Sequence, residues 1–457
     1  MNLFHRMSTT LLSISGFALM ASTSISASAE VRLRNFNQIK SQYGLHEYAY
    51  DLRNTKNLKI AILDNDFAGF PQSMDSLPEG TEYVRGPLAS GPTADQGGHG
   101  LLMAQIVWNL IKSPQSAPKF YLMQANGITN FKAAIDSAIE KRVDMILYAA
   151  TWETGGNFDG KGFINREVNR ATREGITWIN AAGNYHGQIF NSPVVVNPAT
   201  QSLRLPGPND TLTFEVKYSQ TPVKLTLSWN DYKNEEEFQT QKDLDWEIVD
   251  WTGKVFPIRN LKQGTRSRCG DKPAYAQGER SDSLHSREED TVMLGDGVYY
   301  LRIIDCSGNF TTDDKIRLVM QSAKPDAIKF DHATRNYEIM PPADNPSVIT
   351  VGDMSPVSAI GPTTDGRIKP DLILPFTKVE MSDGKVFNGG SSIAAAIYAG
   401  IYANLWSYNQ KLNRSYTMKY LEKLRNEQRN DRRYPRTNGI GPIWRTPTTG
   451  EFDSVFW

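Results

Sequence analysis

The run LKIAIL, residues 58–63, is a short apolar segment that ends directly before Asp64. Two similar runs follow it along the chain, MILYAA at 145–150 and ITWINAAGN at 176–184. Short continuous apolar runs are typical of strands that are buried on both faces of a parallel sheet. Helix-like stretches accompany them, namely GLLMAQIVWNLI (100–111), FKAAIDSAIEKR (131–142) and FINREVNRATREG (163–175). This alternation predicts a three-layer α/β domain with a central parallel sheet and helices on both of its faces.

The pattern changes in the middle of the chain to short alternating segments separated by Asn, Asp and Gly turns. These segments include LTFEVKYSQ, VKLTLSWND, DLDWEIVDWTGKVF, GVYYLRIID and KIRLVMQS. Such alternation predicts an antiparallel β-sandwich. The α/β pattern returns at NPSVITVGD (345–353), so the sandwich interrupts one α/β domain. We expect the first part of that domain at 30–190, the inserted sandwich at 191–335, and the second part with a C-terminal tail at 336–457.

The N-terminus has the pattern of a secretory signal peptide. Arg6 precedes the apolar run LLSISGFALMA, and small residues then lead to Ala27 and Ala29. This order indicates a signal peptide at 1–29 with cleavage after Ala29. The apolar run is too short to span a membrane, and no later stretch reaches about 18 unbroken apolar residues. We expect a protein without a transmembrane segment, exported to the periplasm or secreted.

Composition narrows the function further. Lys and Arg together number 50, as do Asp and Glu, so no global field attracts nucleic acid, and we expect no nucleic-acid partner.

Two cysteines occur, Cys269 and Cys306, both in the sandwich region. In an oxidising compartment a disulfide between them is favoured, and two buried thiols are the alternative.

Residues 387–406 read FNGGSSIAAAIYAGIYANLW and place Ser392 after two glycines, at the start of an apolar helix. Free N–H groups at a helix N-terminus favour a developing negative charge. Taken alone, Ser392 fits a helix cap as well as it fits a nucleophile. Three residues in the α/β segments favour the nucleophile. Asp64 and Asn184 each end an apolar run, where parallel sheets place their sites, and His99 opens an apolar helix.

These four residue types are the set that acyl-transfer chemistry requires. A serine hydroxyl is a weak nucleophile until an imidazole takes its proton, and a carboxylate must hold that imidazole in one tautomer. A side-chain amide can donate to the oxyanion that forms. The sequence therefore suggests Ser392 as nucleophile, His99 as base, Asp64 as orienting carboxylate and Asn184 as oxyanion donor.

At these residues the chain resembles the subtilisin-like serine proteases, or subtilases. AILDND matches the aspartate block of the family at Asp64, and HGLLMA matches its histidine block H-G-T-x-V-A at His99. AAGN is identical to the oxyanion block at Asn184, and GSSIA matches G-T-S-M-A at Ser392. The order Asp, His, Ser is that of subtilisin. The stretch VITVGDMSPVSAIGPTTDGRIKPDLILP also resembles the family's segment before the nucleophile.

Besides Leu101, Ser391 and Ala396, which we expect to be tolerated, the chain departs from the family pattern at two places that bear on function. Asp66 replaces a glycine, and we expect its carboxylate to raise the pKa of the histidine or to bind a cation, with a solvated loop acid as the alternative. The family's S-L-G edge, which pairs with the substrate backbone, aligns with Ala149, Ala150 and Thr151. Together with Gly183 of AAGN, these residues are the substrate-binding set that the resemblance implies. Because the glycine of the S-L-G edge is absent, the pockets that bind substrate residues before the scissile bond should be narrower.

The resemblance implies a serine endopeptidase that cleaves protein or peptide substrates through an acyl-enzyme and requires no cofactor. Acidic groups at 235–237 and 287–290 offer oxygen ligands for a structural Ca²⁺, with solvated loops as the alternative. His186 lies two residues after Asn184 and is a further candidate to line the site. The middle segments resemble jelly-roll modules of secreted bacterial proteases, and we expect this module to control access or to bind a protein partner.

Two other functions stay open on the sequence alone. One is a catalytically degenerate binding or assembly protein that keeps the subtilase fold. It is favoured by Asp66, by the altered residues 149–151, and by the short stretch between Ala29 and Asp64, which leaves no room for the family's usual prodomain. The other is an exported esterase that uses the same residues.

Overall fold

The computed structural model describes residues 32–89, 91, 98–232, 240–255, 278–279, 283–284, 286–324, 326–375, 377–428 and 440–442. The expected signal peptide (1–29), the acidic group at 235–237 and Cys269 lie outside these residues. The signal peptide and the disulfide to Cys306 therefore stay predictions. None of the described helices is both long enough and apolar enough to cross a lipid bilayer.

The centre of the α/β part is a parallel sheet whose described strands number eight, in the order β21-β18-β17-β6-β5-β2-β4-β3. Its strands are β2 (Lys59–Asp64), β3 (Glu82–Val84), β4 (Lys119–Gln124), β5 (Met145–Tyr148), β6 (Thr177–Ala181), β17 (Ile349–Asp353), β18 (Leu372–Leu374) and β21 (Ile440–Pro442). The three apolar runs that opened the sequence analysis form β2, β5 and β6, side by side in the middle of the sheet. The predicted α/β class is confirmed.

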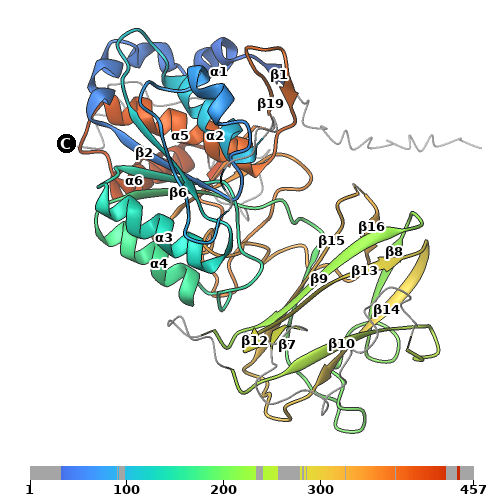
Figure 1. Cartoon of the computed structure of the whole chain (residues 1–457). Coiled ribbons are helices and arrows are strands. Elements are labelled where there is room, and N and C mark those ends of the chain that lie inside the picture. The colour runs from blue at the N-terminus through green and yellow to red at the C-terminus, as the bar shows by residue number, and fades with distance from the viewer. Residues whose placement is uncertain are drawn as a thin grey trace, which may run out of the picture.

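Helices cover both faces of this sheet (Figure 1). They are α1 (Phe36–Gln42), α2 (His99–Ile111), α3 (Gly127–Glu140), α4 (Phe163–Arg173), α5 (Ser391–Tyr408) and α6 (Arg414–Gln428), with short 3₁₀ turns η1 (Leu45–Tyr48), η2 (Asp51–Asn57) and η3 (Pro71–Ser76). Alternate residues of a strand point to opposite faces. Accordingly, Ile60 and Ile62 of β2 pack with α2 and α5, whereas Ala61 and Leu63 pack with α3 and α4.

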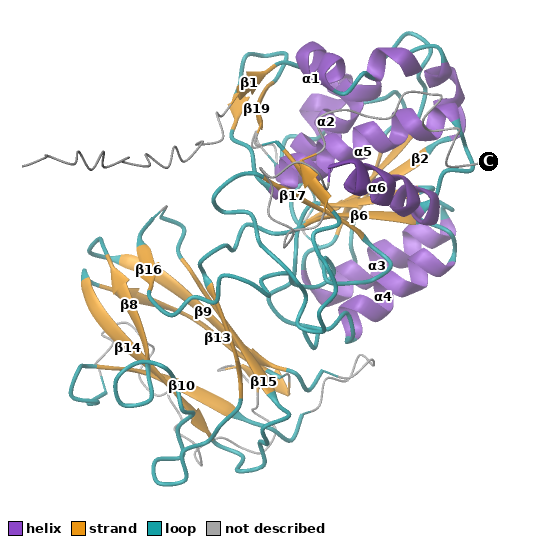
Figure 2. Cartoon of the chain, turned by 180° about the vertical axis from the view of Figure 1, so that it is seen from behind, coloured by secondary structure: helices purple, strands orange, loops and turns teal. Residues whose placement is uncertain are grey.

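The middle of the chain forms two four-stranded antiparallel sheets that share one core (Figure 2). One sheet has the order β10-β14-β8-β16 and the other β13-β9-β15-β7. The strands are β7 (Ile189–Pro193), β8 (Leu212–Val216), β9 (Thr221–Trp229), β10 (Leu244–Val249), β13 (Arg287–Leu294), β14 (Gly297–Asp305), β15 (Lys315–Gln321) and β16 (Ile328–Phe330). The predicted sandwich is confirmed, and its jelly-roll identity stays a prediction. Residues 287–290 begin β13, so their interpretation as a solvated loop is wrong.

Two small sheets complete the described strands. The first joins β1 (Arg32–Arg34), β19 (Thr377–Glu380) and β20 (Val386–Phe387), and the second pairs β11 (Gly278–Glu279) with β12 (Ser283–Leu284). The β19–β20 hairpin leads directly into α5, the helix that carries Ser392.

The sandwich lies in sequence between two neighbouring strands of the parallel sheet. Ile179 of β6 pairs with Ile349 of β17, and all eight sandwich strands lie between them in the chain. The proposed boundaries near residues 190 and 335 stay predictions.

A buried cation fastens the sandwich to the α/β part. Arg317 of β15 is 1% exposed and lies over the ring of Phe158, 4.4 Å from its centroid. Its guanidinium donates to Asn191 Oδ1 at 2.8 Å and to the carbonyl oxygens of Tyr337 at 2.8 Å and Ile339 at 3.2 Å. A buried guanidinium is tolerated only when its donors are satisfied, so these contacts tie β15 to Phe158 and to residues 337–339 of the chain outside the sandwich.

Helices α2 and α5 are in direct contact under the candidate site. Helix α5 is buried along almost its whole length, which explains why its sequence is apolar on every side. At Gly400 the two helices meet so closely that an added Cβ would lie 2.6 Å from Cδ1 and 2.7 Å from Cβ of Leu110. Only glycine fits this contact without movement. The helix that begins at His99 and the helix that carries Ser392 are thereby fixed to each other.

We expect Gly400→Val to destabilise the fold, because overpacking a core costs about 1–3 kcal/mol. Urea unfolding measures the change. Adding Leu110→Ala removes Cδ1 and Cγ from the contact but keeps Cβ, so it should restore part of the loss and make the two changes non-additive. Additive losses in the double variant would show that the helices do not meet at this point.

Candidate active site

Asp64 and His99 form a hydrogen-bonded pair at the carboxyl edge of the sheet. Asp64 is the last residue of β2 and is 3% exposed, while His99 is the first residue of α2 and its side chain is 44% exposed. The Nδ1–H of His99 donates to Asp64 Oδ2 at 2.7 Å. The other carboxylate oxygen accepts from the backbone N–H groups of Asn65 at 2.8 Å and Asp66 at 3.3 Å. This leaves Nε2 as the basic nitrogen of a half-exposed ring.

Gly100 allows α2 to approach the loop after β2. Its N–H donates to the carbonyl oxygen of Asp66 at 2.8 Å, and an added Cβ would lie 2.5 Å from the Cβ of Asp64. A larger residue would push His99 away from the carboxylate. The glycine after the histidine is therefore a geometric requirement of the pair.

Electrostatics favour the protonated form of His99. Burial lowers the pKa of His99, but the hydrogen bond and charge of Asp64, with a further contribution from the charge of Asp66, outweigh it, and the net pKa is raised. Asp66 itself accepts a hydrogen bond from the Ala68 N–H at 2.8 Å. The negative charge of Asp66 thus contributes to the raised pKa of His99, as the sequence led us to expect.

Ser391 and Asn184 join the start of α5 to the turn after β6. Asn184 Oδ1 accepts from both the N–H and the hydroxyl of Ser391, each at 3.1 Å. The same hydroxyl accepts from the N–H of Gly183 at 3.1 Å. Both bonds of the Asn184 side chain use its oxygen, so its amide nitrogen keeps its protons for another acceptor.

Ser392 is the second residue of α5, and its hydroxyl donates to the carbonyl oxygen of Ala149 at 2.9 Å. Among the described residues, no hydrogen bond joins Ser392 to His99. The carbonyl oxygen of Ala150 accepts from Asn180 Nδ2 at 3.0 Å. The structure thus brings Ser392 to the altered segment 149–151, while the role of that segment in substrate binding stays a prediction.

Sequence reasoning missed several residues that support this site. Asp353 ends β17, accepts from the Ser355 hydroxyl at 2.7 Å and receives the N–H of Gly390. Its position as an acid at a strand end, like that of Asp64, is the signal that could have found it. Glu338 is fully buried and accepts from His186 Nδ1 at 3.0 Å and from the N–H of Gly187 at 3.1 Å. His186 therefore holds the turn after Asn184 through a buried carboxylate.

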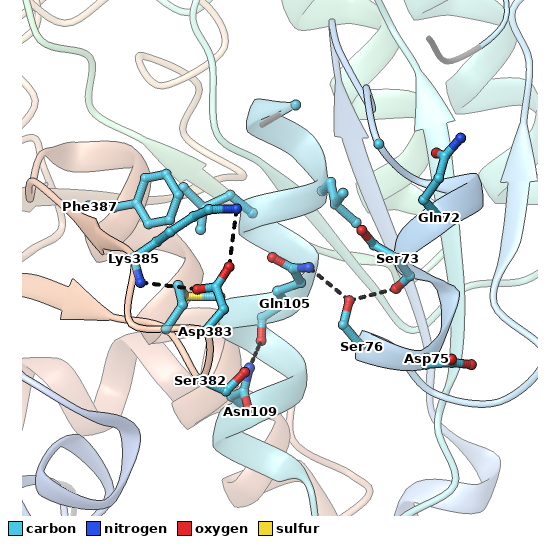
Figure 3. A pocket seen from close by; sticks show the side chains of 15 residues that line it. Gln72, Ser73, Asp75, Ser76, Gln105, Asn109, Ser382, Asp383, Lys385 and Phe387 are labelled. Atoms are coloured by element: carbon cyan, nitrogen blue, oxygen red, sulfur yellow. Dashed lines mark hydrogen bonds and ion pairs between the residues drawn. The ribbon is translucent and has the colours of Figure 1, made fainter. Parts of the chain in front are cut away.

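A pocket of about 330 Å³ runs along α2 from Gly98, the neighbour of His99, towards Asn109 (Figure 3). It lies between η3 and the β19–β20 hairpin. Gln105 donates to Ser76 Oγ at 2.8 Å, and Lys385 pairs with Asp383 at 3.1 Å. The described lining includes neither 149–151 nor 183–185, so the pocket is a separate part of the surface beside His99.

Within the described ranges, no cluster of three or more His, Cys, Asp or Glu side chains is arranged to hold a metal ion. The acidic group at 235–237 lies outside them, so the expectation of a structural Ca²⁺ is untested.

The sequence model of the subtilase family matches residues 55–441. This chain belongs to the subtilase family. The match includes β2, α2, the inserted sandwich and α5, so it covers every residue of the candidate site. No curated protein sequence matches this subtilase.

Solved structures agree with the family. The CspB protease of Clostridium perfringens is similar in fold, with a TM-score of 0.54 at 14% identity over 86% of this chain and 92% of that one. The prenylagaramide maturation protease PagA has 11% identity over 91% and 98%, with a TM-score of 0.41. MycP1 from Mycobacterium smegmatis has 12% identity over 92% and 84%, with a TM-score of 0.41. The family match and the similarity to the CspB protease thus show the subtilase-family protease fold.

We expect Asp66→Asn to lower the pKa of His99, because it removes a negative charge that favours the imidazolium. The histidine would then be neutral down to a lower pH. Titration of the ring protons by NMR measures this. Asp75→Asn is the matched control, since Asp75 is an exposed acid on η3 and does not contribute to the pKa of His99. Equal titration of both variants and the parent would contradict the assigned role of Asp66.

Proposed function

We propose that this subtilase is an exported serine endopeptidase that hydrolyses peptide bonds through an acyl-enzyme on Ser392. The observation that carries the proposal is the 2.7 Å hydrogen bond from His99 to buried Asp64. This hydrogen bond leaves Nε2 of the half-exposed His99 ring available as a base. The same chain carries the serine and asparagine motifs of the family. The predicted signal peptide supports export.

In the proposed reaction, Ser392 Oγ attacks the carbonyl carbon of the scissile bond while His99 Nε2 takes its proton. Asp64 keeps the imidazole in the productive tautomer and stabilises the imidazolium. The oxyanion accepts from Asn184 Nδ2 and from the Ser392 N–H at the start of α5. The imidazolium then protonates the leaving amine. Water, deprotonated by the same histidine, hydrolyses the acyl-enzyme.

The Ser392 hydroxyl must leave Ala149 for this reaction to begin. Rotation about the Cα–Cβ bond of Ser392 moves the hydroxyl from one staggered position to another. Hydrogen bonds between nucleophile and base are often absent before substrate is bound and form in the complex. The half-exposed ring of His99 and the partly exposed Ser392 are both accessible to a polypeptide substrate.

The proposal also gives a role in substrate binding to the pocket along α2 and a role in partner binding to the sandwich. The pocket begins at Gly98, beside the base, and its polar lining suits the part of a peptide that follows the scissile bond. The sandwich is fastened by Arg317 and is the proposed surface for a protein partner. We propose that the reaction needs no cofactor, because all its proton and charge transfers have a residue to perform them.

A second candidate function is a binding or assembly protein that keeps the fold without catalysis. The hydrogen bond from Ser392 to Ala149, in place of one to His99, favours it. Both candidates use the same candidate site, and they differ in whether Ser392 is reactive.

We expect the mature protein to be labelled by a fluorophosphonate at Ser392, and Ser392→Ala to be unlabelled, because only an activated serine reacts. Mass spectrometry of the modified peptide identifies the residue. Ser219→Ala, which removes an exposed serine of the sandwich, should be labelled like the parent. Absence of labelling in the parent would favour the binding protein.

Asn184→Ala should lower kcat by about 10²–10³ with little change in KM, as is typical when one oxyanion donor is removed. Steady-state kinetics on a peptide substrate measure both constants. Asn184→Asp separates donation from structure. It keeps the oxygen that bonds Ser391 but lacks the amide donor, so we expect the same loss. Retained activity in Asn184→Asp would mean that Asn184 only supports the turn.

A further inference from the structure

The following inference rests on the proposed function of Ser392 and Asn184. If both act as proposed, the substrate residue before the scissile bond has a defined place at this site. Their positions put the scissile carbonyl beside the start of α5. Two backbone segments flank this point, because Ala149 accepts from Ser392 and Gly183 donates to Ser391. In the proposed complex, the side chain of the residue that carries the carbonyl then lies beside the segments 149–151 and 183–185, which both contact the start of α5.

The Tyr185 ring lies beside Gly183 and also packs against Ile189, Val319 and Met340. A Cβ added to Gly183 would lie 2.9 Å from Cδ2 and 3.2 Å from Cε2 of the Tyr185 ring, and 3.4 Å from Thr151 Oγ1. One point thus touches both the ring and the threonine from the facing segment. The ring and the Thr151 side chain bridge the two segments and leave little room between them.

Residues of the α/β loop and of the sandwich hold the ring there. The Tyr185 hydroxyl donates to Glu153 Oε1 at 3.5 Å, and the side chains of Thr151 and Gln321 are further partners. Gln321 is the last residue of β15 in the sandwich. Burial raises the pKa of the Tyr185 hydroxyl, and the charge of Glu153 raises it further, so the phenol is neutral and can donate.

Glu153 is itself held by the sandwich. Its Oε2 accepts from Lys224 Nζ and from Thr226 Oγ1, both at 2.8 Å and both on β9. Lys224 also pairs with Glu289 of β13 at 3.2 Å, so two sandwich strands support the contact. The side chain of Glu153 is only 14% exposed, which strengthens these charged hydrogen bonds.

We propose that Tyr185, held by Glu153 and by Lys224 of the inserted sandwich, restricts the residue before the scissile bond to small side chains such as Gly, Ala and Ser. The ring closes the space that a Leu or Phe side chain requires. Tyr185 is then a specificity-determining residue, and Lys224 is a positioning residue that acts through Glu153.

Cleavage profiles on a proteome-derived peptide library test this inference. The parent protein should cleave after Gly, Ala and Ser, and Tyr185→Ala should also cleave after Leu and Phe. On a pair of quenched peptides that differ only in Ala or Phe before the scissile bond, the kcat/KM ratio of Phe to Ala should rise at least tenfold in Tyr185→Ala, since even one methylene in a pocket is worth about tenfold or more.

Matched variants separate the ring from general effects on folding. Tyr185→Phe keeps the ring but loses the hydroxyl that contacts Glu153, so it should relax the preference for Ala only to the small extent expected of Lys224→Met. Lys224→Met should relax the preference in the same direction by a smaller factor. Tyr218→Ala and Lys329→Met remove exposed side chains elsewhere on the sandwich and should leave the ratio unchanged. A parent protein that cleaves after Phe as readily as after Ala, or an unchanged ratio in Tyr185→Ala, would overturn the inference.

Binding to a Ser392→Ala background separates this inference from the proposed function. Fluorescence anisotropy of labelled peptides that end in Ala or in Phe should show tighter binding of the Ala peptide, and Tyr185→Ala in that background should remove the difference. Discrimination in binding without turnover by the parent would reject the peptidase and retain the role of Tyr185. Normal turnover with no discrimination, or no binding of either peptide, would reject the role of Tyr185.

Discussion

The packing of α2 on α5 at Gly400 and Leu110 is the constraint on which the candidate site depends. His99 begins one helix and Ser392 lies in the first turn of the other, so the position of the proposed base relative to the nucleophile is set by how closely these helices approach. Protein cores are close-packed and transmit small displacements. A single methyl group between the helices would therefore act on chemistry that takes place about two helical turns away.

The predictable part of the structure is the part that local patterns encode. Apolar runs that end in Asp64 and Asn184 indicated buried strands and the edge at which they meet, and the motif around Ser392 indicated the helix start. Alternating segments indicated the sandwich. Each of these signals lies within a few residues of the feature it predicts, because the periodicity of a strand or helix is a local property.

The missed residues act through partners that are distant in the chain. Tyr185 lies next to the recognised AAGN motif, yet its role depends on Glu153 from the preceding loop and Lys224 from the sandwich. Glu338 lies in a segment without a motif and acts because folding brings it to His186. Residues 287–290 look like a charged loop, but they form a strand because β9 is there to pair with them. Tertiary contacts of this kind leave no local pattern in one sequence.

The insertion of the sandwich between β6 and β17 also has a consequence for how the protein reaches its native state. These strands are hydrogen-bonded neighbours, but the whole sandwich is synthesised between them. Closing so long a loop before it is ordered carries an entropic penalty that a folded sandwich, with its ends held near each other, largely removes. Ser392, the proposed nucleophile, is synthesised after the insertion. Compaction of the sandwich should thus precede completion of the sheet, so the peptidase activity proposed for this protein would arise only after the sandwich has folded.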